Sequence, residues 1–83
     1  MSDYQVRFKS SALKQLRKLP KQAQQRIIDK ITALGDDPRP ASCRKLKARE
    51  NQWRIRVGDY RIIYTIEDEM VMIVRVGDRR DVY

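Results

Sequence analysis

The sequence of 83 residues contains a single cysteine and no histidine. Cys43 alone cannot form an internal disulfide, and no other residue beside it indicates a metal cage. Without histidine the chain lacks a frequent metal ligand and the usual acid or base near neutral pH. We therefore expect no metal and no small-molecule cofactor, and we interpret Cys43 as a partly buried thiol rather than a nucleophile.

Long apolar runs are also missing. No segment approaches the length needed to cross a bilayer, and no signal peptide opens the sequence. We expect a cytoplasmic protein that does not bind a membrane. With no linker, internal repeat or low-complexity segment, residues 1–83 are predicted to form a single domain with a small but sufficient core.

Positive charge, in contrast, is abundant. Lysine and arginine number 19 against 11 aspartates and glutamates, a net charge of +8. On so small a domain this excess indicates an anionic partner, which could be a nucleic acid, a ribonucleoprotein or an acidic protein. A basic surface that only aids solubility is the alternative, and basicity alone does not indicate recognition of a particular sequence.

Residues 53–64, W-R-I-R-V-G-D-Y-R-I-I-Y, have the pattern of a β-hairpin. Apolar residues alternate with arginines on the first strand, and Gly58-Asp59 is a two-residue turn signal. Such a turn would pair Arg56 with Arg61 and Arg54 with Ile63. Because like charges across a ladder are destabilising, Arg56 and Arg61 form either a solvated pair or a preformed anion site.

The remaining patterns complete an α+β fold. They predict an N-terminal strand over residues 4–9, a helix capped by Ser10 or Ser11, and a second helix from Pro20 to Leu34. The stripe Ala23, Ile27, Ile28, Ile31 and Leu34 is expected to face the core, with Gly35 as the C′ cap.

Residues 39–52 have no period and are expected to form a loop, with a short extended piece near residues 44–46. Residues 70–76 form another predicted strand. The predicted fold is therefore an N-terminal strand, a two-helix hairpin and a three-stranded antiparallel meander, with the helices packed on one face of a small twisted sheet.

A three-residue turn at residues 67–69 would pair Ile66 with Met70 and therefore Arg61 with Arg75. Arg56, Arg61 and Arg75 would then lie in one row on the face without the helices. The tail leaves the strand at Gly77 and carries further arginines and a terminal tyrosine. A basic groove beside an aromatic ring is typical of sites that stack an unpaired base and hold phosphates.

The order of these elements resembles the RelE/ParE superfamily of toxins from bacterial and archaeal toxin–antitoxin pairs. The resemblance is carried by A-L-K-Q-L-R-K-L-P at 12–20, K-L-K at 45–47, the hairpin at 53–64 and V-G-D-R-R-D-V-Y at 76–83. It covers almost the whole chain, and the last motif is most similar to the RelE branch. It implies a ribosome-dependent endoribonuclease that cuts mRNA in the ribosomal A site and inhibits translation. The implied partners are the ribosome, mRNA and a cognate RelB-like antitoxin.

The resemblance also implies a site. The family's catalytic positions match Arg54, Arg56, Arg61, Arg79 and Tyr83. We expect RNA-binding residues among the remaining basic side chains of the loop, the last strand and the tail: Arg44, Lys45, Lys47, Arg49, Arg75 and Arg80.

Two positions depart from the family pattern. Some relatives carry lysine where this chain has Arg54 and Arg56, and many carry histidine where it has Asp78. Arginine stays protonated above about pH 12, so neither arginine is expected to act as a general base. We interpret Asp78 as a pairing partner of the tail arginines rather than a proton acceptor. The expected catalysis therefore depends on electrostatic stabilisation of the transition state.

Two other functions fit the same fold. A ParE-type poison of DNA gyrase would act by binding a protein and would need no arginine-lined cleft. A catalytically silent module that binds RNA or the ribosome would need no general base.

Overall fold

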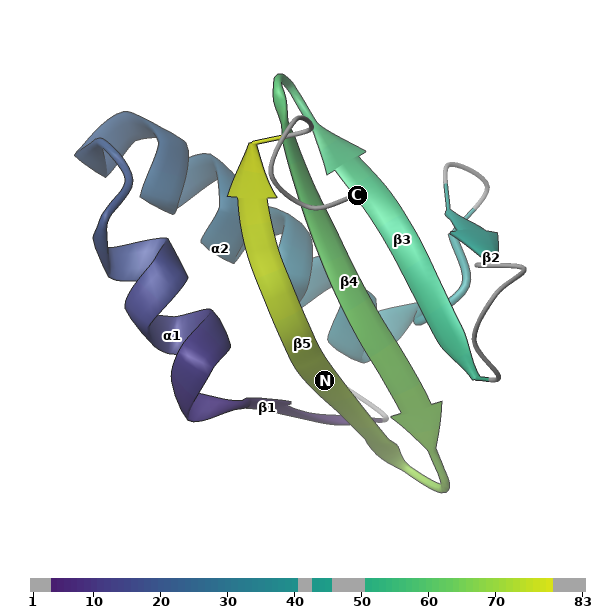
Figure 1. Ribbon diagram of the computed structural model, residues 1–83. Helices are drawn as coiled ribbons and strands as arrows, with labels where there is room; N and C mark the ends of the chain where they lie inside the picture. The colour runs from purple at the N-terminus through teal and green to yellow at the C-terminus, as the bar shows by residue number, and fades with distance from the viewer. Residues whose placement is uncertain (1–3, 41–42, 46–50, 79–83) are drawn as a thin grey trace.

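The computed structural model describes residues 4–40, 43–45 and 51–78 (Figure 1). The elements are β1 (Gln5–Phe8), α1 (Ser10–Arg17), α2 (Lys21–Asp36), β2 (Arg44–Lys45), β3 (Gln52–Val57), β4 (Tyr60–Glu67) and β5 (Met70–Asp78). The strands form one sheet in the order β1-β5-β4-β3-β2, and both helices lie on the same side of it (Figure 1). The predicted α+β class is confirmed, as is the extended piece at residues 44 and 45.

The hairpin of β3 and β4 has the predicted register. Arg56 pairs with Arg61, and Arg54 pairs with Ile63. Gly58 begins the turn with a φ of 60°, which favours glycine. A Cβ atom at Gly58 would lie 3.4 Å from the guanidinium of Arg26 on α2. The turn therefore depends on glycine for its backbone conformation and lies close against α2.

The register between β4 and β5 differs from the prediction. The turn contains two residues rather than three, because Glu67 pairs with Met70 and Asp68 adopts a φ of 52°. Together with an extra residue on β5, this turn pairs Arg61 with Gly77 and Arg75 with Ile63. The predicted single row of Arg56, Arg61 and Arg75 is wrong.

A β-bulge at Val74 adds to this difference. Tyr64 pairs with Ile73 and Ile63 with Arg75, which leaves Val74 as an extra residue on β5. Ile73 and Val76 are both buried, whereas Arg75 is exposed. Strict alternation from Ile73 would have turned Arg75 toward the core, where an unpaired guanidinium is costly. The bulge thus explains how an arginine can follow a buried strand segment without entering the core.

The first strand pairs with the last one, in parallel. Gln5 N donates to Glu69 O at 2.8 Å, and Lys9 N donates to Ile73 O at 2.9 Å. The paired residues of β1 end at Phe8, opposite Ile73. β1 therefore covers only the first half of the outer edge of β5.

Both helices have ends that differ from the prediction. Lys9 is the N-cap of α1 in place of Ser10 or Ser11, and its carbonyl accepts from Leu13 N. α2 continues through Gly35, which is buried and accepts a hydrogen bond from Tyr4 N at 3.0 Å. This bond joins the end of α2 to the chain entering β1. Ile28, predicted on the buried stripe, is 40% exposed.

The core lies between the helices and the sheet. Its largest fully buried side chains come from α2 and the three long strands: Ile27, Leu34, Ile55, Ile62, Tyr64, Val71, Ile73 and Val76. The Tyr64 hydroxyl donates to Pro38 O at 2.8 Å, which joins β4 to the segment after α2. Burial raises the pKa of the Tyr64 phenol well above its ordinary value. In the described part of the chain no helix has the length and apolar character of a membrane span.

Candidate nucleic-acid interface

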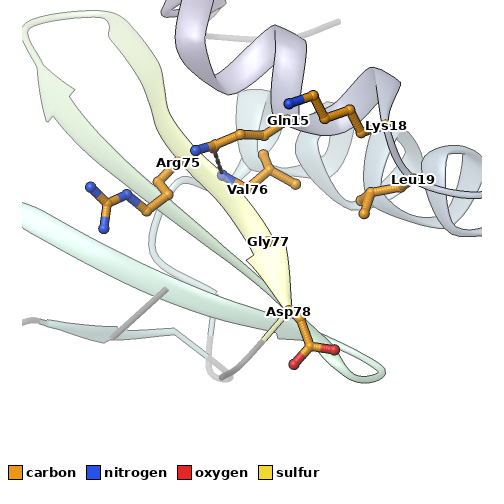
Figure 2. A pocket seen from close by; sticks show the side chains of 7 residues that line it. All are labelled: Gln15, Lys18, Leu19, Arg75, Val76, Gly77 and Asp78. Carbon is orange, nitrogen blue, oxygen red and sulfur yellow. Dashed lines mark hydrogen bonds between the residues drawn. The ribbon is translucent and has the colours of Figure 1, made fainter. Parts of the chain in front are cut away.

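Arginines gather on the face of the sheet opposite the helices. One row across the strands contains Arg44, Arg54, Ile63 and Arg75, and the next contains Arg56, Arg61 and Gly77. We call the surface formed by Arg44, Arg54, Arg56, Arg61 and Arg75 the arginine face. Figure 2 shows the Arg75 side chain extending away from α1, on the opposite side of β5 from Gln15.

The spacing of the strands sets the size of this surface. Neighbouring strands lie about 4.8 Å apart, so the row from β2 to β5 spans roughly 14 Å at the level of the backbone. Neither row contains an aspartate or glutamate among its residues. Five guanidinium groups on so small an area produce a strong local positive potential.

Arg61 is at the centre of the arginine face. It is half-buried, and its Nε atom is buried. Arg56 lies directly across β3, and Gly77 lies directly across β5. Gly77 therefore contributes no side chain at the position opposite Arg61. The like-charged pair is thus part of a larger cluster, which favours the anion-site interpretation over two solvated side chains.

An apolar residue lies between the arginines of the first row. Ile63 is only 6% exposed, although it is on the arginine face and is flanked by Arg54 and Arg75. The aliphatic stems of arginine can pack along such a side chain and hold the guanidinium groups apart. The sequence alone predicts no role for Ile63, because the row that includes Arg75 depends on the bulge.

Lys45 does not join the arginines. It pairs with Trp53, whose side chain shares the helix side of the sheet with Tyr64. The Lys45 Nζ atom lies 5.9 Å from the centroid of the Trp53 ring, and the Arg39 guanidinium carbon lies 5.3 Å from it. These are cation–π contacts, and they bring Lys45 to the edge of the helix layer.

Several predicted site residues lie outside the described residues. They are Lys47 and Arg49 in the loop, and Arg79, Arg80 and Tyr83 in the tail. Asp78 is described and is half-buried at the end of β5, opposite Tyr60. Gly77 does not end the strand as predicted, since β5 continues through Asp78.

The sequence patterns did not predict that one further basic residue lies on this face. Arg7 on β1 is exposed and pairs with Met72, which places it on the same face as the arginines. The parallel pairing of β1 with β5 determines this position. No local motif signals that pairing, so the sequence could not have placed Arg7 there.

The chemistry available to the arginine face is binding and stabilisation of negative charge. Guanidinium groups donate paired hydrogen bonds to phosphate oxygens, and they can stabilise additional charge that develops during a reaction. They do not accept protons near neutral pH. Among the described residues there is no group of three or more acidic or cysteine side chains placed to hold a metal ion.

Comparison with known proteins places this architecture in a family. Residues 6–83 match the family described as ParE toxin of type II toxin–antitoxin system, parDE. A RelE-like toxin protein of Escherichia coli is 37% identical over 86 residues, which cover 96% of this chain and 90% of the relative. Toxin RelG of Mycobacterium tuberculosis is 38% identical over 85 residues, covering 96% and 95% of the two chains.

A solved structure agrees in fold. The archaeal RelE–RelB complex from Pyrococcus horikoshii OT3 contains a chain that superposes with a TM-score of 0.82 at 28% identity. The match covers 96% of this chain and 99% of the other. The chain belongs to the RelE/ParE family of toxins from type II toxin–antitoxin systems. Within that family it is a toxin of the RelBE type.

Proposed function

We propose that this toxin is a ribosome-dependent endoribonuclease that cleaves mRNA in the ribosomal A site and thereby inhibits translation. The observation that supports this proposal is the cluster of five arginines on one face of a RelE-type fold. A toxin that acts only by binding a protein has no need for guanidinium groups held in two adjacent rows.

The proposed reaction is an intramolecular transesterification at a phosphate of the RNA backbone. The ribose 2′-oxygen forms a bond to the adjacent phosphorus, and the bond from phosphorus to the 5′-oxygen of the next nucleotide breaks. The products are a 2′,3′-cyclic phosphate and a 5′-hydroxyl, so the proton lost from the 2′-hydroxyl is balanced by the one gained at the 5′-oxygen. The pentacoordinate transition state carries extra negative charge, which Arg54, Arg56 and Arg61 are proposed to stabilise with preorganised hydrogen bonds.

Proton transfer needs a group other than arginine. Tyr83 is the proposed candidate, with Arg79 and Arg80 a few residues before it in sequence. Cationic neighbours lower the pKa of a phenol and stabilise the phenolate, and the ring can also stack on a base of the codon. Arg44 and Arg75, with Lys47, Arg49 and Arg80, are proposed to bind the RNA backbone, whereas Lys45 is left out of this set because it contacts Trp53 on the helix side.

The proposed protein partner is a RelB-like antitoxin, because a chain of similar fold was solved in a RelE–RelB complex. A toxin with a net charge of +8 suits a neutralising partner that is acidic or amphipathic. The other proposed partners are the ribosome and mRNA, in the cytoplasm.

Primer extension on mRNA in a purified translation system tests the proposal. The protein should produce cuts within translated codons and none on the same RNA without ribosomes. Arg56→Ala should weaken cleavage, whereas Arg17→Ala, which removes an equal charge from exposed α1, should not. Stalled translation without cuts would instead support a silent ribosome-binding module. DNA damage signalling in cells without mRNA cuts would support a gyrase poison.

A further inference from the structure

The second half of β5 lies at an edge of the sheet that β1 does not cover. The last main-chain bond between the two strands joins Lys9 N to Ile73 O. β5 then continues past the bulge to Asp78 and runs beside α1. Residues at such an edge need another partner for their outward main-chain groups.

Gln15 of α1 supplies a partner in place of a strand. Its side-chain oxygen Oε1 accepts a hydrogen bond from Val76 N at 2.9 Å, across 61 residues of sequence (Figure 2). The contact is partly buried. Gln15 and β5 line a cavity of about 460 Å³ together with Lys18, Leu19 and Asp78.

The position of this bond matters because of the bulge. Val74 is the extra residue, and Val76 is the first residue after it to face the core, with only 2% of its surface exposed. A shift of one residue in this segment would exchange the faces of Arg75 and Val76. Such a shift would also replace Gly77 as the residue opposite Arg61. A bond to Val76 N stabilises one of these registers.

We propose that Gln15 is a positioning residue that fixes the register of β5 after the bulge. Through Val76 it holds Arg75 on the arginine face and Gly77 opposite Arg61. It contacts no part of the proposed substrate. The effect on cleavage rests on the proposed function, whereas the effect on the strand does not.

Two substitutions separate the hydrogen bond from the shape of the side chain. Gln15→Met keeps an unbranched side chain of similar length and removes the carbonyl oxygen. Gln15→Glu keeps an oxygen that can accept from Val76 N, and its added charge has one cation, Lys18, and one anion, Asp78, on the same cavity. Gln22→Met, at an exposed position of α2, is the matched control.

The first measurement is amide hydrogen exchange by NMR. In Gln15→Met the Val76 amide should exchange roughly two- to tenfold faster, as expected for one lost hydrogen bond. The amide resonances of Arg75 and Gly77 should shift. Gln15→Glu and Gln22→Met should stay near the parent. The proposal would be overturned if the Val76 amide exchanged at the parent rate in Gln15→Met. It would also be overturned if that amide exchanged as fast in Gln15→Glu as in Gln15→Met.

The second measurement is the maximal cleavage rate at saturating programmed ribosomes, at a temperature where circular dichroism shows each variant folded. Gln15→Met should cleave roughly tenfold more slowly than the parent, whereas Gln15→Glu should cleave at about the parent rate. A Gln15→Met variant with faster exchange but the parent rate would show a purely structural role. If the parent itself does not cleave, the proposed function fails, and hydrogen exchange with the Arg75 and Gly77 resonances still decides the role of Gln15.

Discussion

Arg61 combines three properties that single it out among the arginines. It is at the centre of the arginine face, it is half-buried, and it has a like-charged residue directly across the ladder. Arg61→Ala should reduce cleavage by about 10²–10³-fold, the usual cost of removing one anion-stabilising group. Because the substitution also relieves repulsion from Arg56, stability should be equal or higher by a few tenths of a kcal/mol.

Thermal melting beside the ribosome-dependent cleavage assay checks both parts of this prediction. Arg17→Ala is the control for loss of a charge. A large drop in melting temperature for Arg61→Ala would mean that the side chain holds the sheet together, and its assignment to the active face would fail.

Tyr83 is proposed to contribute a ring, a hydroxyl or both. Tyr83→Phe keeps the ring for stacking on a codon base, an interaction worth ~1–3 kcal/mol, and removes the hydroxyl. If stacking dominates, the phenylalanine variant should retain most activity and Tyr83→Ala should lose it. If the hydroxyl transfers a proton, both variants should fail alike in single-turnover cleavage. Parent-like cleavage by both would remove Tyr83 from the site.

Because of Tyr64, the stability of the fold should fall as the pH becomes alkaline. Its pKa is raised by burial, so the folded protein keeps the phenol proton at a pH where the unfolded chain, with a pKa near 10, releases it. This stabilisation is fully present below about pH 10, and stability then falls by up to about 1.4 kcal/mol per pH unit. Tyr64→Phe should show a smaller fall above about pH 10.

At neutral pH the same variant should be less stable by about 1–3 kcal/mol, because Pro38 O loses its buried donor. Urea unfolding from about pH 8 to about pH 11 measures both effects. Identical pH dependence in the parent and the variant would show that another group titrates.

The hairpin of β3 and β4 depends on one backbone conformation. Gly58 has a positive φ, whereas its neighbour Asp59 does not. Gly58→Ala should therefore destabilise the protein by about 1–2 kcal/mol, since a Cβ atom is strained in this region. Asp59→Ala, at the other turn position, should change stability by less than about 0.5 kcal/mol. Chemical denaturation of the two variants gives the comparison, and equal costs would contradict it.

The elements differ in how well local patterns predict them. The register of β3 with β4 could be predicted, because a two-residue turn and strict alternation determine it completely. The register of β4 with β5 could not, because a two-residue turn with a positive φ at Asp68 and an extra residue at Val74 both change the count. The bulge keeps Arg75 out of the core. Local sequence does not indicate it, because the core exists only once the helices have packed on the sheet.

Helix ends show the same limitation. Gly35 has the residue type of a cap, but it lies inside α2, and its carbonyl accepts a hydrogen bond from Tyr4 N just before β1. Ile28 fits the apolar stripe by spacing, yet it lies at the edge of the interface and is partly exposed. Tertiary contacts decide both cases.

For the candidate site, Arg54, Arg56 and Arg61 could be placed on one face from the hairpin alone. The roles of Ile63, Gly77 and Arg7 depend on β5 and on its parallel partner β1. The residues that complete the site from the tail remain predictions.

At the scale of the whole molecule, the family predicts an effect on growth. Expression of this protein alone should arrest a bacterial host, and coexpression of a small RelB-like protein encoded beside it should restore growth. Plasmid induction with and without that neighbour makes the measurement. Arg61→Ala is the matched variant and should permit growth. Normal growth with soluble, folded parent protein would count against a toxin.

The parallel pairing of β1 with β5 affects how the protein folds during its synthesis. β1 is synthesised before β5 and can form its parallel pairing only after β5 has been made, since Gln5 lies opposite Met70. Closing so long a loop has an entropic cost that only the completed sheet offsets. A nascent chain that still lacks β5 also lacks Arg75 and Gly77, which complete the two rows. The ribosome that synthesises this toxin must therefore add β5 before the arginine face can be completed.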